Sequence, residues 1–518
     1  MRFQRLGQAS RSHLSRASRG LLVAALLAGC GSSSSGSDGA AGAAGAAAGF
    51  SDAYPSAPAG STAKVLYVSA KYTGGASDGS AAHPFAAIGP AITAANGPTV
   101  VLVAPGTYAE SLEITKSDLG VYGSSDPTSE AGIILQAPQG AAAIRITGAS
   151  NVTVQSVSIP KPTVAGIWVN GGKATTLSGI VVDGAHDIAA QPFGHGVVAT
   201  NAAEIILQHS KVNGSSQVGV MISGAAAIIL QSEIGGNALG GVRIQDGVGG
   251  SRVEGCQLVA NTVMGIGVFG SQAIILQNGI SGTIASKADP ATGLEDGIAD
   301  GVIVSQGLMG APANVEVKQG NLINDNGRAG VLVDGNAMGI ILQNDIGGNR
   351  HTGIYLQSGA GGPTGVQITS NVLMGNHVGG IGVTANAAGI ILQNTVGGTL
   401  AEPLFTGLDM PVIGDGIGVY AMASATIEGN TVTGSGRFGV IFDGASGATT
   451  ALKANVVSGS AKSEIILQNP GAAPPSIDSS LMAAVTTVAA TDKAYPTDSK
   501  PFGRAPASSP PSKLAGRR

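Results

Sequence analysis

Three residues that can carry acid–base chemistry occupy one position of a repeating pattern. His195, Asp300 and Asp415 each come directly before a glycine that opens a glycine–apolar–any–apolar segment, and in the other eight such segments this preceding residue is uncharged. Two carboxylates about 5 to 10 Å apart can cleave a glycosidic bond as acid and base, which makes Glu295 or Asp296 with Asp300 a candidate catalytic couple. The alternative, which we favour, is that these side chains close turns through hydrogen bonds.

The same three residues end insertions between repeats, at residues 185–195, 283–300 and 399–415. Because all three insertions precede the same glycine, we expect them at one edge of the fold, four repeats apart. At the spacing of stacked strands this is about 19 Å. The three side chains therefore cannot act on one bond, although a long polysaccharide could touch all of them.

Three further residues are candidates for ligand binding: Trp168, Arg243 and Tyr355. Arg243 is expected in an outward-facing column beside Met221 and Gly267, where its guanidinium could meet an acidic sugar; a solvated arginine is the alternative. The sequence has no HExxH, paired CxxC, GxSxG or phosphate-loop pattern, which argues against zinc, serine-hydrolase and nucleotide-dependent chemistry. We expect no metal and no other cofactor.

The elements that position these residues follow from the repeat. The glycine column recurs mostly every 22 to 30 residues, and a second, mainly asparagine column follows each glycine. Its members are His209, Ser232, Cys256, Asn278, Asn321, Asn344, Asn371, Asn394, Asn430 and Asn455. This period predicts a parallel β-solenoid, in which like residues stack about 4.8 Å apart and asparagines form ladders at a bend. Cys256 is expected to be a buried thiol without chemistry.

The chain resembles the right-handed parallel β-helix proteins of the pectate-lyase-like superfamily from about residue 64 to 469. The resemblance is most specific in "LYVSAKYTGGASDGSAAHPFAAIGPAITAA" and "PTVVLVAPGTYAESLEI". It implies an all-β fold, a right-handed single-stranded parallel β-helix of about a dozen rungs. Phe85, Ile88, Ala91 and Ile92 have helical spacing and should form an N-terminal capping helix.

The resemblance does not carry an activity across to this chain. Lyases of the superfamily commonly use a Lys or Arg base near Asp-bound calcium, and the hydrolases use an Asp cluster on one strand face. Neither set can be matched residue by residue here, so calcium is expected only if the protein is a lyase.

The tetrad Ile-Ile-Leu-Gln occurs seven times, starting at residues 133, 205, 228, 274, 340, 390 and 465. Aligned on the asparagine column, Ile341 should point inward while Ile340 and Leu342 point outward. Core packing would accept Val for Ile at little cost, so the identity exceeds what the fold requires. The tetrads reflect either a recent duplication, which we favour, or an outward apolar stripe for self-association or another partner.

The N-terminus predicts export. Residues 1–29 read as a signal peptide whose end, "LAGC", resembles the lipobox of bacterial lipoproteins and implies lipidation of Cys30. Residues 30–62 then form a flexible tether, residues 63–469 the β-helix, and residues 470–518 a mostly disordered Pro/Ala/Ser-rich tail with a short helix near 479–490. Gly31 after the cysteine favours the outer membrane or cell surface over the inner membrane.

These features predict a surface lipoprotein held at the membrane by its lipid. With a formal net charge of -4 and no basic cluster in the body of the chain, nucleic acid is excluded as the main partner. We expect a non-catalytic scaffold or a protein that binds polysaccharide or another partner. The alternative is a polysaccharide lyase or glycoside hydrolase that works through the edge loops.

Overall fold

The computed structural model describes residues 50–124, 132–187, 193–247, 249–287, 297–307, 310–358, 364–403, 412–445, 450–469 and 474–488. Every described residue belongs to the second of the two units into which the chain divides, which begins at Phe50. Cys30, Glu295 and Asp296 lie outside the described residues. No helix in the described ranges combines the length and apolar character needed to cross a membrane.

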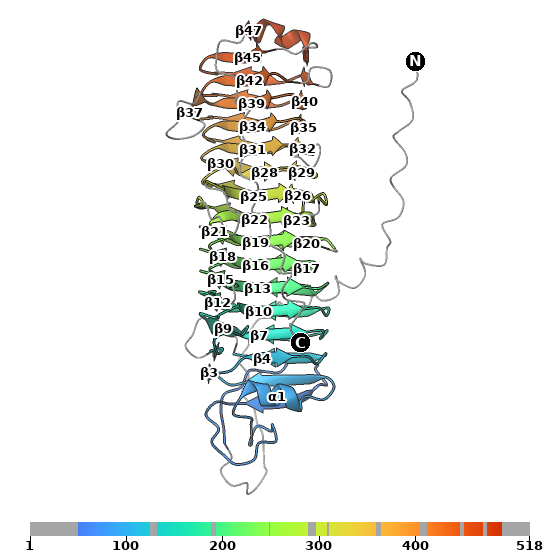
Figure 1. Cartoon of the computed structure of the whole chain (residues 1–518), viewed down its shortest axis with the longest axis vertical. Helices are drawn as coiled ribbons and strands as arrows, with labels where there is room; N and C mark the ends of the chain where they lie inside the picture. The colour runs from blue at the N-terminus through green and yellow to red at the C-terminus, as the bar shows by residue number, and fades with distance from the viewer. Residues whose placement is uncertain are drawn as a thin grey trace, which may run out of the picture. The chain divides into compact units, whose positions relative to one another are not determined.

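Three long parallel sheets, here named A, B and C, form the second unit, and each turn of chain adds one strand to each sheet (Figure 1).

Sheet A has 16 strands: β1 (Lys64–Val68), β2 (Thr99–Val103), β5 (Leu119–Tyr122), β8 (Thr153–Gln155), β11 (Thr175–Ser178), β14 (Glu204–Gln208), β17 (Ala226–Leu230), β20 (Ser251–Glu254), β23 (Gln272–Leu276), β26 (Asn314–Lys318), β29 (Met338–Leu342), β32 (Gly365–Thr369), β35 (Ala388–Leu392), β40 (Ser424–Glu428), β43 (Ala451–Lys453) and β46 (Ser476–Ile477).

Sheet B has 14 strands: β3 (Gly106–Tyr108), β6 (Ile133–Leu135), β9 (Val157–Pro160), β12 (Val181–Asp183), β15 (Lys211–Asn213), β18 (Glu233–Gly235), β21 (Gln257–Val259), β24 (Gly279–Ser281), β27 (Leu322–Asn324), β30 (Asp345–Gly347), β33 (Val372–Met374), β36 (Thr395–Gly397), β41 (Thr431–Thr433) and β44 (Val456–Ser458).

Sheet C has 15 strands: β4 (Leu112–Ile114), β7 (Ile144–Thr147), β10 (Ala165–Asn170), β13 (His195–Thr200), β16 (Val218–Ser223), β19 (Gly240–Gln245), β22 (Val263–Phe269), β25 (Ala299–Ser305), β28 (Val331–Val333), β31 (Thr352–Gln357), β34 (Gly379–Thr384), β39 (Asp415–Tyr420), β42 (Phe438–Asp443), β45 (Ser463–Gln468) and β47 (Val485–Val488). A separate antiparallel pair joins β37 (Glu402–Pro403) to β38 (Val412–Ile413).

The predicted β-helix is confirmed, with more rungs than the expected dozen. The sequence count relied on the glycine column, which fails at both ends: Ala143 and Glu464 stand where inner rungs have glycine. Inside the stack glycine is required, because a Cβ on Gly416 would lie 2.5 Å from the carbonyl oxygen of Gly439 in the next rung. The column therefore marks a close approach of successive backbones at the corner between sheets B and C.

The asparagine column forms a ladder at the corner between sheets A and B. Asn344, for example, donates from Nδ2 to Oδ1 of Asn371 in the next rung (3.0 Å) and to the carbonyl oxygen of Val317 (2.9 Å). One predicted member is wrong: His209 is exposed with a left-handed φ of 49°, and Ser210 takes the ladder position. The tetrad at 205 is shifted by one residue, which misled the alignment.

A second ladder, at the corner between sheets B and C, was missed in the sequence. Its continuous stretches join Asn237 to Asn261, and Asn326 to Asn349 and Asn376, through side-chain amides 2.9 to 3.0 Å apart. The signal was the spacing Asn-x4-Asn, as in Asn344 and Asn349.

The N-terminal cap is confirmed. Ile88, Ala91 and Ile92 of α1 (Ile88–Ala94) are buried against the solenoid core, and Phe85 packs beside them. Glu110 of the "PGTYAE" motif accepts the backbone N–H groups of Ile88 and Gly89 (2.7 and 2.8 Å), which satisfies the helix start. The motif thus joins the first rung to its cap.

The sheets continue beyond residue 469. β46 adds to sheet A and β47 to sheet C, with the 3-10 helix η2 (Ser479–Ala484) between them. This helix falls within the range where a short helix was expected.

Candidate functional site on the outer face of sheet C

Trp168, Arg243 and Tyr355 lie in one outward-facing column of sheet C. In-register pairing runs through Trp168, Val198, Met221, Arg243, Gly267, Ile303, Leu332, Tyr355, Gly382, Gly418, Ile441 and Ile466. Arg243 therefore has Met221 and Gly267 as its column neighbours, as predicted. The three candidates share a face but not a point, because three rungs separate Trp168 from Arg243 and four separate Arg243 from Tyr355.

Trp168 lies in the N-terminal section of this column and is partly exposed. The guanidinium of Arg145 lies 4.8 Å from the centre of its ring, and the indole Nε1 donates to Thr200 Oγ1 at 3.1 Å. Phe193 adds a second ring 6.5 Å away. The Trp168 indole is fixed by its hydrogen bond, is partly exposed and lies beside a cation, so it can stack on the flat face of a ligand.

Arg243 and Tyr355 are buried despite pointing outward. The Arg243 guanidinium lies 4.7 Å from the centre of the Phe269 ring, and its Nε donates to Gln245 Oε1 at 2.8 Å. Burial lowers the pKa of Arg243 to about 10, partly offset by Asp246. Tyr355 makes an edge contact with His351 at 6.0 Å between ring centres, and burial lowers the pKa of His351 to about 3, helped by the charge of Arg328.

Asp415 and Asp300 perform the same structural task at the start of their strands. Asp415 is fully buried, receives Arg437 Nε at 2.8 Å and the Tyr420 hydroxyl at 2.5 Å, and accepts the backbone N–H of Phe438 at 3.3 Å. Asp300 is likewise buried, pairs with Arg328, and accepts the N–H of Ala329 at 2.9 Å. Desolvation by itself would lower the pKa of Arg328. The charge of Asp300 and its hydrogen bond have the larger combined effect, so the pKa of Arg328 is raised.

His195 repeats the arrangement without an arginine. Its Nδ1 accepts the N–H of Val218 at 3.2 Å, so His195, Asp300 and Asp415 all bind the residue that precedes the next column glycine. Desolvation lowers the pKa of His195 to about 4, and the charge of Arg243 adds to this shift. The bond from each of these three side chains to a backbone N–H joins one rung to the next.

One acid–base pair, which joins Glu402 of the insertion at 399–415 to His377 of the preceding rung, was not identified from the sequence. His377 Nδ1 lies 2.8 Å from Oε1 of Glu402, and the side chains are 27% and 46% exposed. A signal was lacking because 25 residues separate the partners. Across the described ranges, no three His, Cys, Asp or Glu side chains gather in a way that could hold a metal ion.

Cys256 is buried in the first ladder, and burial raises the pKa of its thiol to about 11. The backbone N–H of Cys256 donates to Asn278 Oδ1 at 2.9 Å. Its place matches the expected inert thiol.

The tetrads do not share one structural position. Those at 228, 274, 340 and 390 occupy one register of sheet A, with Ile341 buried against Ile368 and Ile340 outside, as predicted. The copy at 205 is shifted by one residue, the copy at 133 lies in sheet B, and the copy at 465 lies in sheet C. On sheet A, outward Ile274, Ile340 and Ile390 alternate with Glu316 and Gln367, so the apolar side chains form separated patches.

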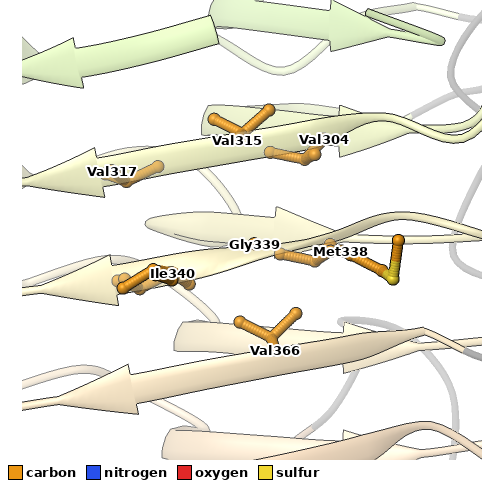
Figure 2. A pocket seen from close by; sticks show the side chains of 9 residues that line it. Val304, Val315, Val317, Met338, Gly339, Ile340 and Val366 are labelled. Atoms are coloured by element: carbon orange, nitrogen blue, oxygen red, sulfur yellow. The ribbon is translucent and has the colours of Figure 1, made fainter. Parts of the chain in front are cut away.

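A small cavity of about 10 Å³ lies inside the solenoid around Gly339 (Figure 2). Gly339 stands in an inward column between Val315 and Val366, so the missing side chain leaves the gap. The volume is that of about one water molecule and the lining is apolar, which makes this a packing defect.

Comparison with known proteins agrees with the fold. Residues 121–281 and 313–399, just under half of the chain, match the family model for the right handed beta helix region. The match agrees with the three parallel sheets, and the chain is therefore a right-handed parallel β-helix. No curated protein sequence matches it significantly.

Several solved structures are similar to this chain at low identity. A double mutant of a periplasmic alginate epimerase is 13% identical, with 76% of this chain and 77% of that chain covered and a TM-score of 0.37. A pectate lyase is 15% identical, with 71% and 78% covered and a TM-score of 0.35. The mannuronan C-5 epimerase A-module of Azotobacter vinelandii is 14% identical, with 79% and 99% covered and a TM-score of 0.37.

Proposed function

We propose that this protein is an exported, lipid-anchored β-helix that binds polysaccharide without cleaving it. The observation that carries this proposal is the engagement of the acid–base candidates: Asp300 and Asp415 are buried, each paired with an arginine and a backbone N–H of the next rung. A general acid or base must exchange a proton with substrate, and these carboxylates are instead committed to holding the stack.

Binding is assigned to the N-terminal section of sheet C. Trp168 is partly exposed there, held by Thr200 and flanked by Arg145. An aromatic ring can stack on the apolar face of a sugar, and the guanidinium can pair with a uronate carboxylate. The repeated rungs suit a polymer, because a chain that runs along the column meets strand after strand.

The test measures binding and turnover together. Purified protein is titrated with a polyuronate and with a neutral glucan, and new reducing ends and unsaturated-uronate absorbance are followed. We expect saturable polyuronate binding that Trp168→Ala weakens at least about tenfold, a change of about 1.4 kcal/mol, without sustained product. Tyr122→Ala, on the outer face of sheet A, serves as the control and should bind normally.

Sustained product would favour the alternative, a lyase or glycoside hydrolase acting through the edge loops. Because His377 and Glu402 form a partly exposed acid–base pair there, Glu402→Gln would then be expected to reduce turnover. Binding that is insensitive to Trp168→Ala would contradict the assigned surface.

Membrane attachment rests on the "LAGC" motif. Cys30→Ser should abolish incorporation of labelled palmitate and move the protein from the membrane to the soluble fraction. Unchanged partitioning would contradict the lipid anchor and leave the binding test unaffected.

A further inference from the structure

The outer face of sheet C changes character along the column. From β19 to β45 its outward side chains are buried, and we name this section the covered face: Arg243, Phe269, Ile303, Leu332, Tyr355, Tyr420, Ile441 and Ile466. Ile303 and Ile441 are each 1% exposed, whereas Ile340 and Ile390, outward on sheet A, are 37% and 49% exposed. Side chains that point away from a sheet become buried only when something lies across them.

The chemistry of the covered face is aromatic and acidic. Phe269, Tyr355 and Tyr420 join Phe438 in one buried cluster with the isoleucines. Asp334 and Asp443 lie on the same side of sheet C, each 6% exposed. Asp334 accepts the backbone N–H of Gly335, Asp443 accepts Asn469 Nδ2, and the Tyr420 hydroxyl donates to Asp415.

The described chain ends beside this face. β47 is the last strand of sheet C, and Val488 packs against the covered cluster. Residues 489–518 follow, with six Lys or Arg and two Asp. This segment also carries Tyr495 and Phe502 and the prolines Pro496, Pro501, Pro506, Pro510 and Pro511.

We propose that residues 489–518 run back along the covered face as an intramolecular strap. Pro-rich segments favour the extended polyproline conformation and dock on aromatic-lined grooves. The 30 residues can span about 90 Å in that conformation, and the nine strand spacings from β47 back to β19 need only about 43 Å. The basic side chains complement Asp334 and Asp443. This inference does not depend on polysaccharide binding.

The strap would cover two of the three candidate ligand-binding residues and leave the third open. Arg243 and Tyr355 lie beneath it, whereas Trp168, three rungs before β19, lies beyond the buried section.

The test uses thiol labelling of the full chain carrying Cys30→Ser. Ile441→Cys reports on the covered face, and Ile390→Cys is its matched control on sheet A. Cys256 is buried with a raised thiol pKa, so it contributes little background. We expect Ile441→Cys to react at least about tenfold more slowly than Ile390→Cys, equivalent to about 1.4 kcal/mol of protection, and both to react alike when the chain stops after Val488.

Protection of Ile441→Cys that persists in the folded, shortened chain would overturn the proposal, since another part of the protein would be the cover. Protection that depends on protein concentration would overturn it in favour of a second copy. If the shortened chain does not fold, Tyr495→Ser with Phe502→Ser in the full chain must still expose Ile441→Cys. Failure to do so would equally overturn the strap.

Discussion

The outer faces of sheets A and C follow the same strand alternation but present different surfaces. On sheet A, outward isoleucines alternate with Glu316 and Gln367 and are open to water. On sheet C, isoleucine, leucine and tyrosine follow each other in the column and are buried, as are Asp334 and Asp443 on the same side of the sheet. An outward position in a solenoid is therefore not by itself a surface position, and the difference lies in what the rest of the chain places on each sheet.

Charged pairs at buried and at open positions of the solenoid differ in the same way. The Asp415–Arg437 pair beside sheet C is buried, whereas Lys211 and Glu233, 3.0 Å apart on sheet B, are each 50% exposed. A buried pair that loses one partner leaves an uncompensated charge, while an exposed pair exchanges its partner for water. The mutations below test how far this contrast extends.

The largest effect should come from Asp415→Ala. It leaves Arg437 buried without its counter-charge, and we expect a loss of about 3 to 5 kcal/mol in the free energy of unfolding measured in urea. Glu233→Ala, the exposed control, should cost less than about 1 kcal/mol. Equal small losses would show that water reaches Asp415. From the sequence alone, one turn hydrogen bond would predict about 0.5 to 1.5 kcal/mol, a value we keep for His195→Ala.

The two outer faces can be compared directly with one substitution. Ile441→Ala on sheet C should lower the free energy of unfolding by about 2 to 5 kcal/mol, because buried volume is lost and a cavity is left. Ile390→Ala on sheet A should cost under about 1 kcal/mol, as exposed substitutions usually do. Similar losses at both sites would remove the distinction between the faces.

The buried histidine beside Tyr355 should make stability depend on pH. The pKa of His351 falls from the ordinary 6.5 to about 3 on folding, so between these values the unfolded chain binds the proton more tightly. Stability should therefore be complete above pH 6.5 and decline as the pH falls towards 3, by up to about 1.4 kcal/mol per pH unit. His351→Gln should reduce this slope in urea titrations across pH without abolishing it, because the pKa of His195 is also lowered, to about 4. His209→Gln, at an exposed ring, should leave it unchanged.

The smallest effect is expected at Leu342 of the tetrad. Leu342→Thr should cost under about 1 kcal/mol in the free energy of unfolding, because Thr369 fills the same column in the next rung. Its inward neighbour gives the reference: Ile341→Ala should cost about 2 to 5 kcal/mol. A large loss at Leu342 would mean that this part of sheet A is covered too.

The sequence predicted the features that repeat and missed those that depend on other parts of the chain. The glycine column, the cap at Ile88 and the inward Ile341 follow from local spacing, so the sequence alone predicts them. The burial of Arg243 and Tyr355 was not, because strand alternation gives direction and says nothing of what lies above. The partners Arg328 and Arg437 come from the next rung, and the exposed position of His209 required the register of β14.

The asparagine ladders give the solenoid a direction of growth. Each ladder amide donates forward to the oxygen of the next asparagine and backward to a carbonyl of the preceding rung, as Asn371 does to Asn394 and Ile341. In a rung that has just formed, the forward N–H of the ladder amide therefore has no acceptor until the next rung folds onto it. Because the N-terminal cap closes first as the chain is synthesised, only the advancing C-terminal end carries this unsatisfied group, and assembly from the N-terminus onward keeps one incomplete rung at a time.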